Sequence, residues 1–67
     1  FEVTIPEEWL GKTVGQLDIR KKYGINILAT RKYGKTDVAV SPETVLDGDA
    51  TILVLGEYKA IQKCFRI

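Results

Sequence analysis

The chain has no histidine and a single cysteine, and this shortage limits how a fold of only 67 residues can be stabilised. Domains of this size bury only roughly 60% of the surface that their unfolded chain exposes, so their stability alone is marginal. One cysteine cannot form an internal disulfide, and a chain without histidine lacks the usual ligand set for structural zinc. Oligomerisation is the stabilising device that remains, and we expect the chain to use it.

The net charge and the hydropathy exclude several other classes of protein. Ten basic residues stand against nine acidic ones, whereas a nucleic-acid surface needs a clear basic excess. The 45% hydrophobic content is typical of a folded domain. The longest aliphatic run is Ile52–Leu55, so we expect no signal peptide and no membrane-spanning segment. Because the chain begins with Phe1 rather than Met, we expect residues 1–67 to be a single domain cut from a longer protein.

The first half of the chain predicts a strand and then a helix. Residues 1–5 alternate apolar and polar side chains, as a half-buried strand does, and Pro6 ends them. The spacing of Thr13 and Gln16 predicts a capping box, and Gly24 supplies the left-handed stop for a helix over 13–24. Three cations at 20–22 lie in its last turn, where the helix dipole favours them. An apolar stripe on this helix would be formed by Val14, Leu17 and the Lys21 stem.

The second half predicts three strands and a closing helix. Strands are expected over 25–31 and 36–40, joined by a turn at 32–35, and over 50–55 after the turn at 47–49. The final helix covers 57–65, with Tyr58, Ile61 and Phe65 at helical spacing. The element order is therefore βαβββα, an α+β fold with a small, mainly antiparallel sheet and two helices.

No group of residues has the pattern of a catalytic site, so we do not expect an enzyme. Cys64 lies near a helix C-terminus without a neighbouring base, and Ser41 lacks the glycine-flanked turn of a hydrolase nucleophile. The acidic residues at 37, 47 and 49 do not follow calcium-loop spacing, and we expect no metal. Residues 11–13 look like the end of a phosphate-binding loop, but Pro6 occupies the position of its first glycine.

A binding site is more plausible where the first helix turns into the second strand. Arg20 lies in the last helical turn and Asn26 opens the strand, so a tight turn at Gly24 can bring both to one sheet edge. A guanidinium and an amide placed together suit a phosphate and a base edge. Ile25 and Ile27 flank Asn26 and supply apolar surface on the other pleat face. The alternative is that Arg20 is a surface charge and Asn26 caps a turn.

Two stretches carry a resemblance to a known family. One runs from Gly11 to Arg20 and continues from Tyr23 to Ala29, and the other comprises Pro42, the segment Val45–Asp49 and the strand Ile52–Gly56. Together they resemble the C-terminal domain of RCK proteins, also called TrkA-C, which is found in regulators of Trk/Ktr-type potassium uptake. The resemblance covers nearly the whole chain. It implies a dimerising βαβββα module that follows a nucleotide-binding Rossmann lobe.

The resemblance also implies a ligand and partners. In the bacterial potassium-uptake branch this module is a receptor for cyclic di-AMP, held at the homodimer interface. The family pattern makes Arg20 and Asn26 the polar ligand residues, and it suggests four apolar walls for adenine: Val14, Ile25, Ile27 and Pro42. It implies a cytoplasmic regulator that inhibits a membrane potassium transporter, reached through the N-terminal lobe. No further cofactor, nucleic-acid polymer or direct membrane insertion is expected.

Two other functions remain open. The chain could be a dimerisation module of a transporter or antiporter that binds no ligand, in which case Arg20 is only a solvated charge. It could also be the same receptor domain fused to a DNA-binding transcription regulator.

Overall fold

The computed structural model describes residues 1–66 and confirms the α+β class and the antiparallel sheet. The sheet has four strands in the order β1-β4-β2-β3, and every neighbouring pair is antiparallel. Its strands are β1 (Glu2–Thr4), β2 (Asn26–Lys32), β3 (Lys35–Asp37) and β4 (Ala50–Leu55). The helical elements are η1 (Glu7–Trp9), α1 (Val14–Leu17), α2 (Ile19–Tyr23) and α3 (Tyr58–Phe65).

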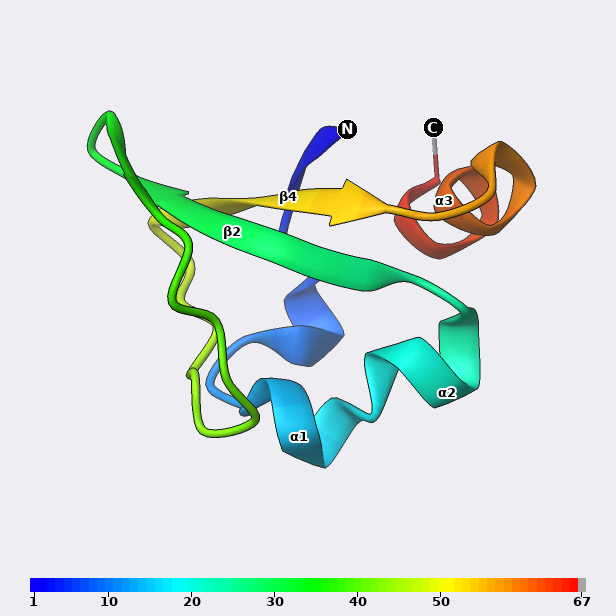
Figure 1. Ribbon diagram of the computed structural model, residues 1–67, viewed down its shortest axis with the longest axis horizontal. Coiled ribbons are helices and arrows are strands. Elements are labelled where there is room, and N and C mark those ends of the chain that lie inside the picture. Colours follow the sequence, from blue (N-terminus) through cyan, green and yellow to red (C-terminus); the bar gives the residue numbers. More distant parts are fainter. Residues whose placement is uncertain (67) are drawn as a thin grey trace.

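Figure 1 shows how these elements are arranged. β2 and β4 run side by side across the molecule, α1 and α2 lie below them in this view, and α3 follows at the end of β4. The loop after β3 descends along one side toward α1. This loop closes on α1 through backbone hydrogen bonds, from Val14 to Thr44 (2.9 Å) and from Gly15 to Pro42 (2.8 Å). Within residues 1–66 no helix has the length and apolar character needed to cross a membrane.

The core lies between one face of the sheet and the helical elements. Ile52 occupies its centre, because β4 is an inner strand and Ile52 pairs with Val3 on one side and Thr30 on the other. The buried members of this cluster are Val3, Trp9, Ile19, Ile25, Leu46, Ile52, Val54 and Ile61. Helix α1 adds no fully buried residue, but its Val14 and Leu17 pack against this cluster.

The predicted helix over 13–24 is two short helices rather than one. Asp18 adopts the left-handed conformation (φ 50°, ψ 46°), which ends α1 and begins α2. Asp is one of the few side chains that tolerate this conformation. The break turns α2 relative to α1, so Ile19 is buried at 2% exposure while Lys21 lies in solvent. The predicted stripe through Lys21 was therefore wrong.

The strand predicted over 36–40 is shorter and begins earlier, since β3 covers only Lys35–Asp37. The Asp37 carboxylate accepts a hydrogen bond from the Ala39 amide at 2.9 Å. Such an Asx turn redirects the backbone and ends the ladder. The chain between β3 and Pro42 is thereby released to run toward α1.

A turn that the sequence did not predict, η1, places the single tryptophan. The Trp9 amide donates to the Pro6 carbonyl at 2.9 Å, and Trp9 is only 4% exposed. Its ring lies edge-on to Phe65, with 5.4 Å between the ring centroids. The N-terminal segment is thereby fixed to the C-terminal helix α3.

The predicted capping box is present, and its removal should destabilise the fold. The Thr13 hydroxyl accepts from the Gln16 amide (3.1 Å), and the Gln16 side chain accepts from the Thr13 amide (2.9 Å). We expect Thr13→Ala to lower the free energy of unfolding by about 1 kcal/mol. Urea unfolding followed by circular dichroism measures this loss, and Thr13→Ser should retain most of the stability because it keeps the hydroxyl. Equal losses in both variants would show that the cap is not the cause.

An ion pair between β2 and the turn before β4 should make stability depend on pH. Lys32 lies 2.6 Å from Asp47; its hydrogen bond lowers the pKa of the Asp47 carboxyl, and the same contact raises the pKa of Lys32. A lowered carboxyl pKa gives stability that is present at neutral pH and lost as the pH falls through the folded-state pKa. The raised lysine pKa gives stability that is lost only as the pH rises through the folded-state value.

We therefore expect Asp47→Asn to reduce the stability at pH 7 and to leave it nearly unchanged at pH 2. The amide oxygen of Asn can still accept from the Asp49 amide, as the Asp47 carboxylate does at 3.0 Å. Urea unfolding at both pH values measures the difference, which should be small because both side chains are partly exposed to solvent. If the stability of Asp47→Asn depended on pH as that of the wild type does, the Lys32–Asp47 pair would not be the cause of the pH dependence.

Candidate functional site

Arg20 and Asn26 are brought together where α2 ends and β2 begins. Gly24 closes α2 in the left-handed conformation (φ 69°), which reverses the chain between the two residues. The Arg20 Nε donates to the Asn26 Oδ1 at 2.7 Å. This hydrogen bond holds the plane of the guanidinium and leaves its terminal nitrogens to the solvent. Within residues 1–66 Arg20 forms no ion pair, so its charge is not already neutralised by a carboxylate.

All six residues singled out by the sequence line one pocket of about 360 Å³. This volume lies in the range of small-molecule sites, ~300–1,000 Å³. The six are Val14 from α1, Arg20 from α2, Ile25, Asn26 and Ile27 at the start of β2, and Pro42 from the loop after β3. Residues 40 and 41 complete the wall beside Pro42.

The apolar walls differ in how much surface they present. Val14 and Ile27 are half-buried and Pro42 is exposed, so each can contact a ligand directly. Ile25 is 0% exposed and belongs to the core, so it forms the floor beneath the pocket rather than an open wall. The expectation that Ile25 presents apolar surface is therefore modified, because its side chain points into the core.

Asp18 is a pocket residue that sequence reasoning missed. Asp18 lines the same pocket as Arg20, and its side chain makes no hydrogen bond that caps α2. The pocket rim thus combines one cation, one carboxylate and one amide. Any anion that binds here depends on Arg20, because no other cation lines the pocket among the described residues. The signal that could have revealed Asp18 is its position two residues before Arg20 in the sequence.

The absence of a side chain at Gly15 allows Pro42, which is distant in sequence, to approach α1 and line the pocket. A Cβ on Gly15 would lie 2.9 Å from the Pro42 carbonyl oxygen and 3.0 Å from its Cβ. Side-chain carbon atoms do not approach backbone so closely, and here the backbone of α1 does so only because no Cβ is present. Within residues 1–66 the site also contains no group of three metal-ligating side chains.

Adding that Cβ should open the pocket. We expect Gly15→Ala to displace the loop around Pro42 and to weaken binding of the pocket's ligand about tenfold, with a stability loss of ~1–3 kcal/mol from the steric clash. Thermal melting and ligand titration measure the two effects. Gly48→Ala is the matched control, since a Cβ there meets only Leu10 side-chain atoms at 3.9 Å and 4.0 Å. A Gly15→Ala variant that melts and binds as Gly48→Ala does would contradict the close-approach explanation.

Comparison with known families gives one match over the full length. A family model described as the TrkA-C domain matches residues 1–67. No curated protein is significantly similar to the chain. RCK C domains are regulatory domains, and no catalytic family is indicated.

Solved structures show the same fold. The RCK C domain of the potassium transport protein KtrA, in complex with cyclic diadenosine monophosphate, has a TM-score of 0.88 and 24% identity, covering 98% of this chain and 78% of that one. The RCK_C domain dimer of S. agalactiae BusR in complex with cyclic di-AMP has a TM-score of 0.81 and 25% identity, covering 98% and 93%. The GsuK channel bound to NAD has a TM-score of 0.81 and 25% identity.

The coverage of the longer structures is much lower. The chain covers 35% of BusR in its complex with busAB-promotor DNA, and 12% of the NAD-bound GsuK channel. The family model matches the whole length of the chain, and the KtrA domain shares its fold over 98% of that length. The chain therefore belongs to the TrkA-C family, the C-terminal domains of RCK proteins.

Proposed function

We propose that the domain binds cyclic di-AMP across a homodimer interface and so inhibits a bacterial potassium transport system. The observation that carries the proposal is the Arg20–Asn26 hydrogen bond of 2.7 Å on the rim of a pocket that contains all six expected ligand residues. A guanidinium held by an amide is a prepared phosphate ligand, because its orientation is already restricted before the anion arrives.

The relatives support this choice of ligand. The KtrA RCK C domain and the BusR RCK_C dimer were both solved in complex with cyclic di-AMP. In this chain the pocket joins an apolar part, formed by Val14, Ile27 and Pro42, to the polar pair. An adenine would lie against the apolar part and a phosphate oxygen would accept from Arg20.

Symmetry supports a dimer. Cyclic di-AMP contains two equivalent adenosine phosphate halves, and the interface of a two-fold dimer contains two equivalent copies of every residue. Each subunit would therefore contribute one Arg20 to one phosphate and one apolar pocket to one adenine. The pocket of about 360 Å³ is open at the surface and would be closed by the second subunit.

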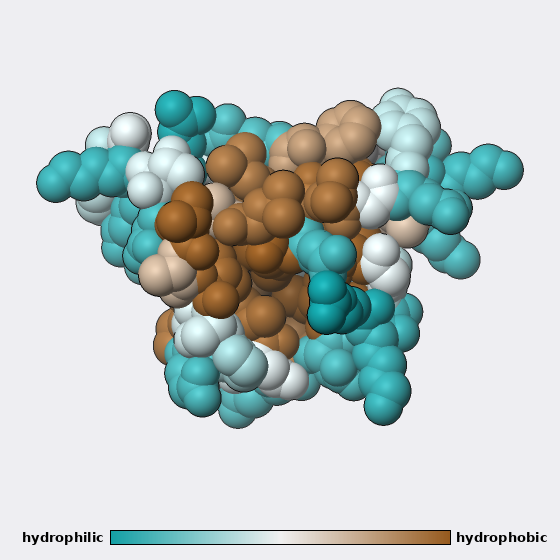
Figure 2. Space-filling view, in the orientation of Figure 1, coloured by the Kyte–Doolittle hydropathy of each residue, from teal (hydrophilic) through white to brown (hydrophobic). Residues whose placement is uncertain are grey.

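Exposed apolar surface supports the same arrangement. Figure 2 shows apolar side chains gathered over the middle of the molecule, across β2 and the neighbouring loop, with polar side chains around them. Leu28 of β2 is 51% exposed, Val38 after β3 is 77% exposed and Leu55 of β4 is 58% exposed. Exposed apolar side chains gathered on one face mark interaction sites. A second subunit would bury them and supply the stabilisation that a 67-residue core lacks.

Regulation of a transporter requires that the ligand bind two arrangements of the dimer with different affinities. A ligand shifts a dimer between two arrangements only if it binds one of them more tightly. We propose that cyclic di-AMP favours an arrangement that closes the transporter, transmitted through an N-terminal lobe that lies outside residues 1–67 of a longer cytoplasmic protein. The domain itself needs no cofactor for this role.

A melting experiment tests the ligand. We expect cyclic di-AMP at 100 times its dissociation constant to stabilise the native state by about 2.7 kcal/mol, which raises the melting temperature by several degrees. Cyclic di-GMP and AMP at the same concentration are the controls. The absence of any shift with cyclic di-AMP, or an equal shift with all three compounds, would favour a dimerisation module that binds no ligand.

One observation favours a second function. BusR, whose RCK_C dimer binds cyclic di-AMP, was also solved in complex with promotor DNA, and the chain covers 98% of its own length in that match. The same receptor domain can therefore be joined to a DNA-binding domain. Sequencing the gene upstream of Phe1 separates the two functions, because a Rossmann lobe indicates a transporter subunit and a DNA-binding domain indicates a transcription regulator.

A further inference from the structure

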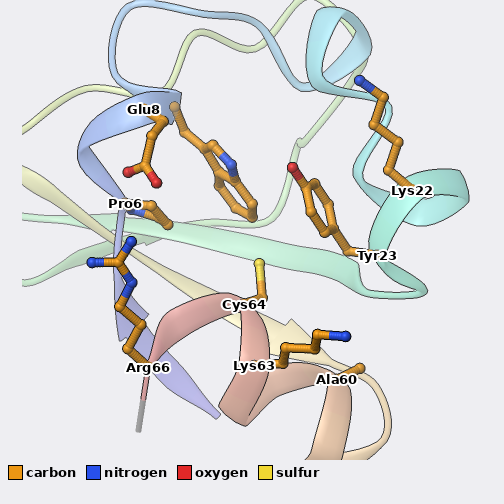
Figure 3. A pocket seen from close by; sticks show the side chains of 9 residues that line it. Pro6, Glu8, Lys22, Tyr23, Ala60, Lys63, Cys64 and Arg66 are labelled. Atoms are coloured by element: carbon orange, nitrogen blue, oxygen red, sulfur yellow. The ribbon is translucent and has the colours of Figure 1, made fainter.

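A second pocket, larger than the Arg20 pocket, lies between η1, α2 and α3. Its volume is about 560 Å³, and none of its lining residues belongs to the Arg20 pocket. Figure 3 shows it from close by, with Tyr23 on one side and the Cys64 sulfur pointing into the space beside it. Trp9 also lines the pocket and lies next to Tyr23. The family resemblance assigns no role to these residues.

The walls of this pocket are aromatic and rigid. Trp9 is 4% exposed and is held by two other rings, Tyr23 at 5.7 Å and Phe65 at 5.4 Å between centroids. Pro6 and Ala60 extend the apolar lining. Tyr23 is 40% exposed and lines the pocket, so it presents most of the open aromatic surface of this cluster. Offset or edge-on packing of a further planar ring is favoured at such a surface.

The rim carries a local excess of positive charge. Lys22, Lys63 and Arg66 line the pocket together with one acidic residue, Glu8. Three cations and one carboxylate give the pocket a formal charge of +2, although the whole chain is only +1. In Figure 3 the Arg66 and Glu8 side chains lie on one side of the pocket with their charged groups toward each other, and Lys63 extends from α3 on the other side. An anion is therefore attracted to a pocket whose interior is aromatic.

We propose that this pocket binds a small aromatic anion, with a planar ring packed against Tyr23 beside Trp9 and a carboxylate or phosphate near Lys63. The site is separate from the cyclic di-AMP site, but α2 contributes to both, through Arg20 in one and Tyr23 in the other. Because the two pockets share no lining residue, both ligands can bind at once.

Cys64 offers a direct measurement because it is the only thiol of the chain. It is partly exposed and lines the pocket, and burial raises the pKa of its thiol. We expect 1-naphthoate at ten times its dissociation constant to slow alkylation of Cys64 by N-ethylmaleimide about tenfold, because a bound ring covers the sulfur. The uncharged isostere 1-naphthamide should protect far less, and 1-naphthyl phosphate distinguishes the two anionic groups.

Matched variants identify the charged groups. We expect Lys63→Gln to weaken naphthoate protection about tenfold, whereas Lys59→Gln on the same helix should leave it unchanged because Lys59 does not line the pocket. Equal protection by naphthoate and naphthamide, equal loss in both lysine variants, or no protection at all would overturn the proposal. Arg20→Ala should retain naphthoate protection while losing cyclic di-AMP, so failure of one site is distinguishable from failure of the other.

Discussion

Replacing Arg20 with alanine is expected to lower the affinity for cyclic di-AMP by about 10²- to 10⁴-fold. Each charged hydrogen bond contributes about 1.5–3 kcal/mol, and a symmetric dimer loses two of them, which amounts to about 3–6 kcal/mol. The loss should be large because Arg20 is the only cation lining this pocket among the described residues, and Asp18 would remain on the rim. Isothermal titration calorimetry measures the change.

Lys21→Ala is the matched control for this variant. Lys21 lies beside Arg20 on α2, is exposed and lines neither pocket, so its removal deletes the same charge without deleting a ligand. We expect its affinity to stay within about twofold of the wild type, since screening weakens an exposed charge at this distance. The affinity of Asn26→Ala for cyclic di-AMP should fall between those of the two variants. This substitution removes the 2.7 Å hydrogen bond that holds Arg20 but keeps the cation. An Arg20→Ala variant that binds like Lys21→Ala would remove the basis of the proposed site.

Replacing Ile52 with alanine is expected to lower the free energy of unfolding by about 2–5 kcal/mol. Ile52 is 0% exposed on the inner strand β4 and packs in the single core of the described chain. A domain of this length has a total stability of roughly 3–10 kcal/mol, so the variant would lose a large part of it. Urea unfolding followed by circular dichroism measures the loss.

Val45→Ala provides the contrast for the core variant. Val45 is 56% exposed, and its truncation should cost less than about 0.5 kcal/mol. If Ile52→Ala unfolded at the same urea concentration as Val45→Ala, the assignment of Ile52 to the centre of the core would be wrong.

Local patterns predicted most of the fold. Alternation identified the edge strand β1, and the spacing of Thr13 and Gln16 identified a capping box that the structure contains. The helix break at Asp18 was not predictable from periodicity, because a left-handed aspartate leaves no mark on the apolar pattern around it. The burial of Ile19 follows from that break, since it sets the phase of α2.

The candidate site was likewise predictable only in part. Arg20 and Asn26 are six residues apart across a glycine turn, so their contact follows from local chain geometry. The approach of Pro42 to Gly15 depends on a long-range packing of the loop after β3 against α1, and no local pattern encodes it. The pocket around Trp9 depends likewise on three segments that meet only in the folded chain.

The number of ligands bound per chain tests the central proposal most directly. Cyclic di-AMP titrated into the wild-type chain in a calorimeter should bind with one ligand for every two chains, because each subunit of the dimer contributes half of one site. Sedimentation of the same sample should show a dimer. Saturation at one ligand per chain, or no saturable heat at micromolar ligand, would contradict a site shared across the dimer interface.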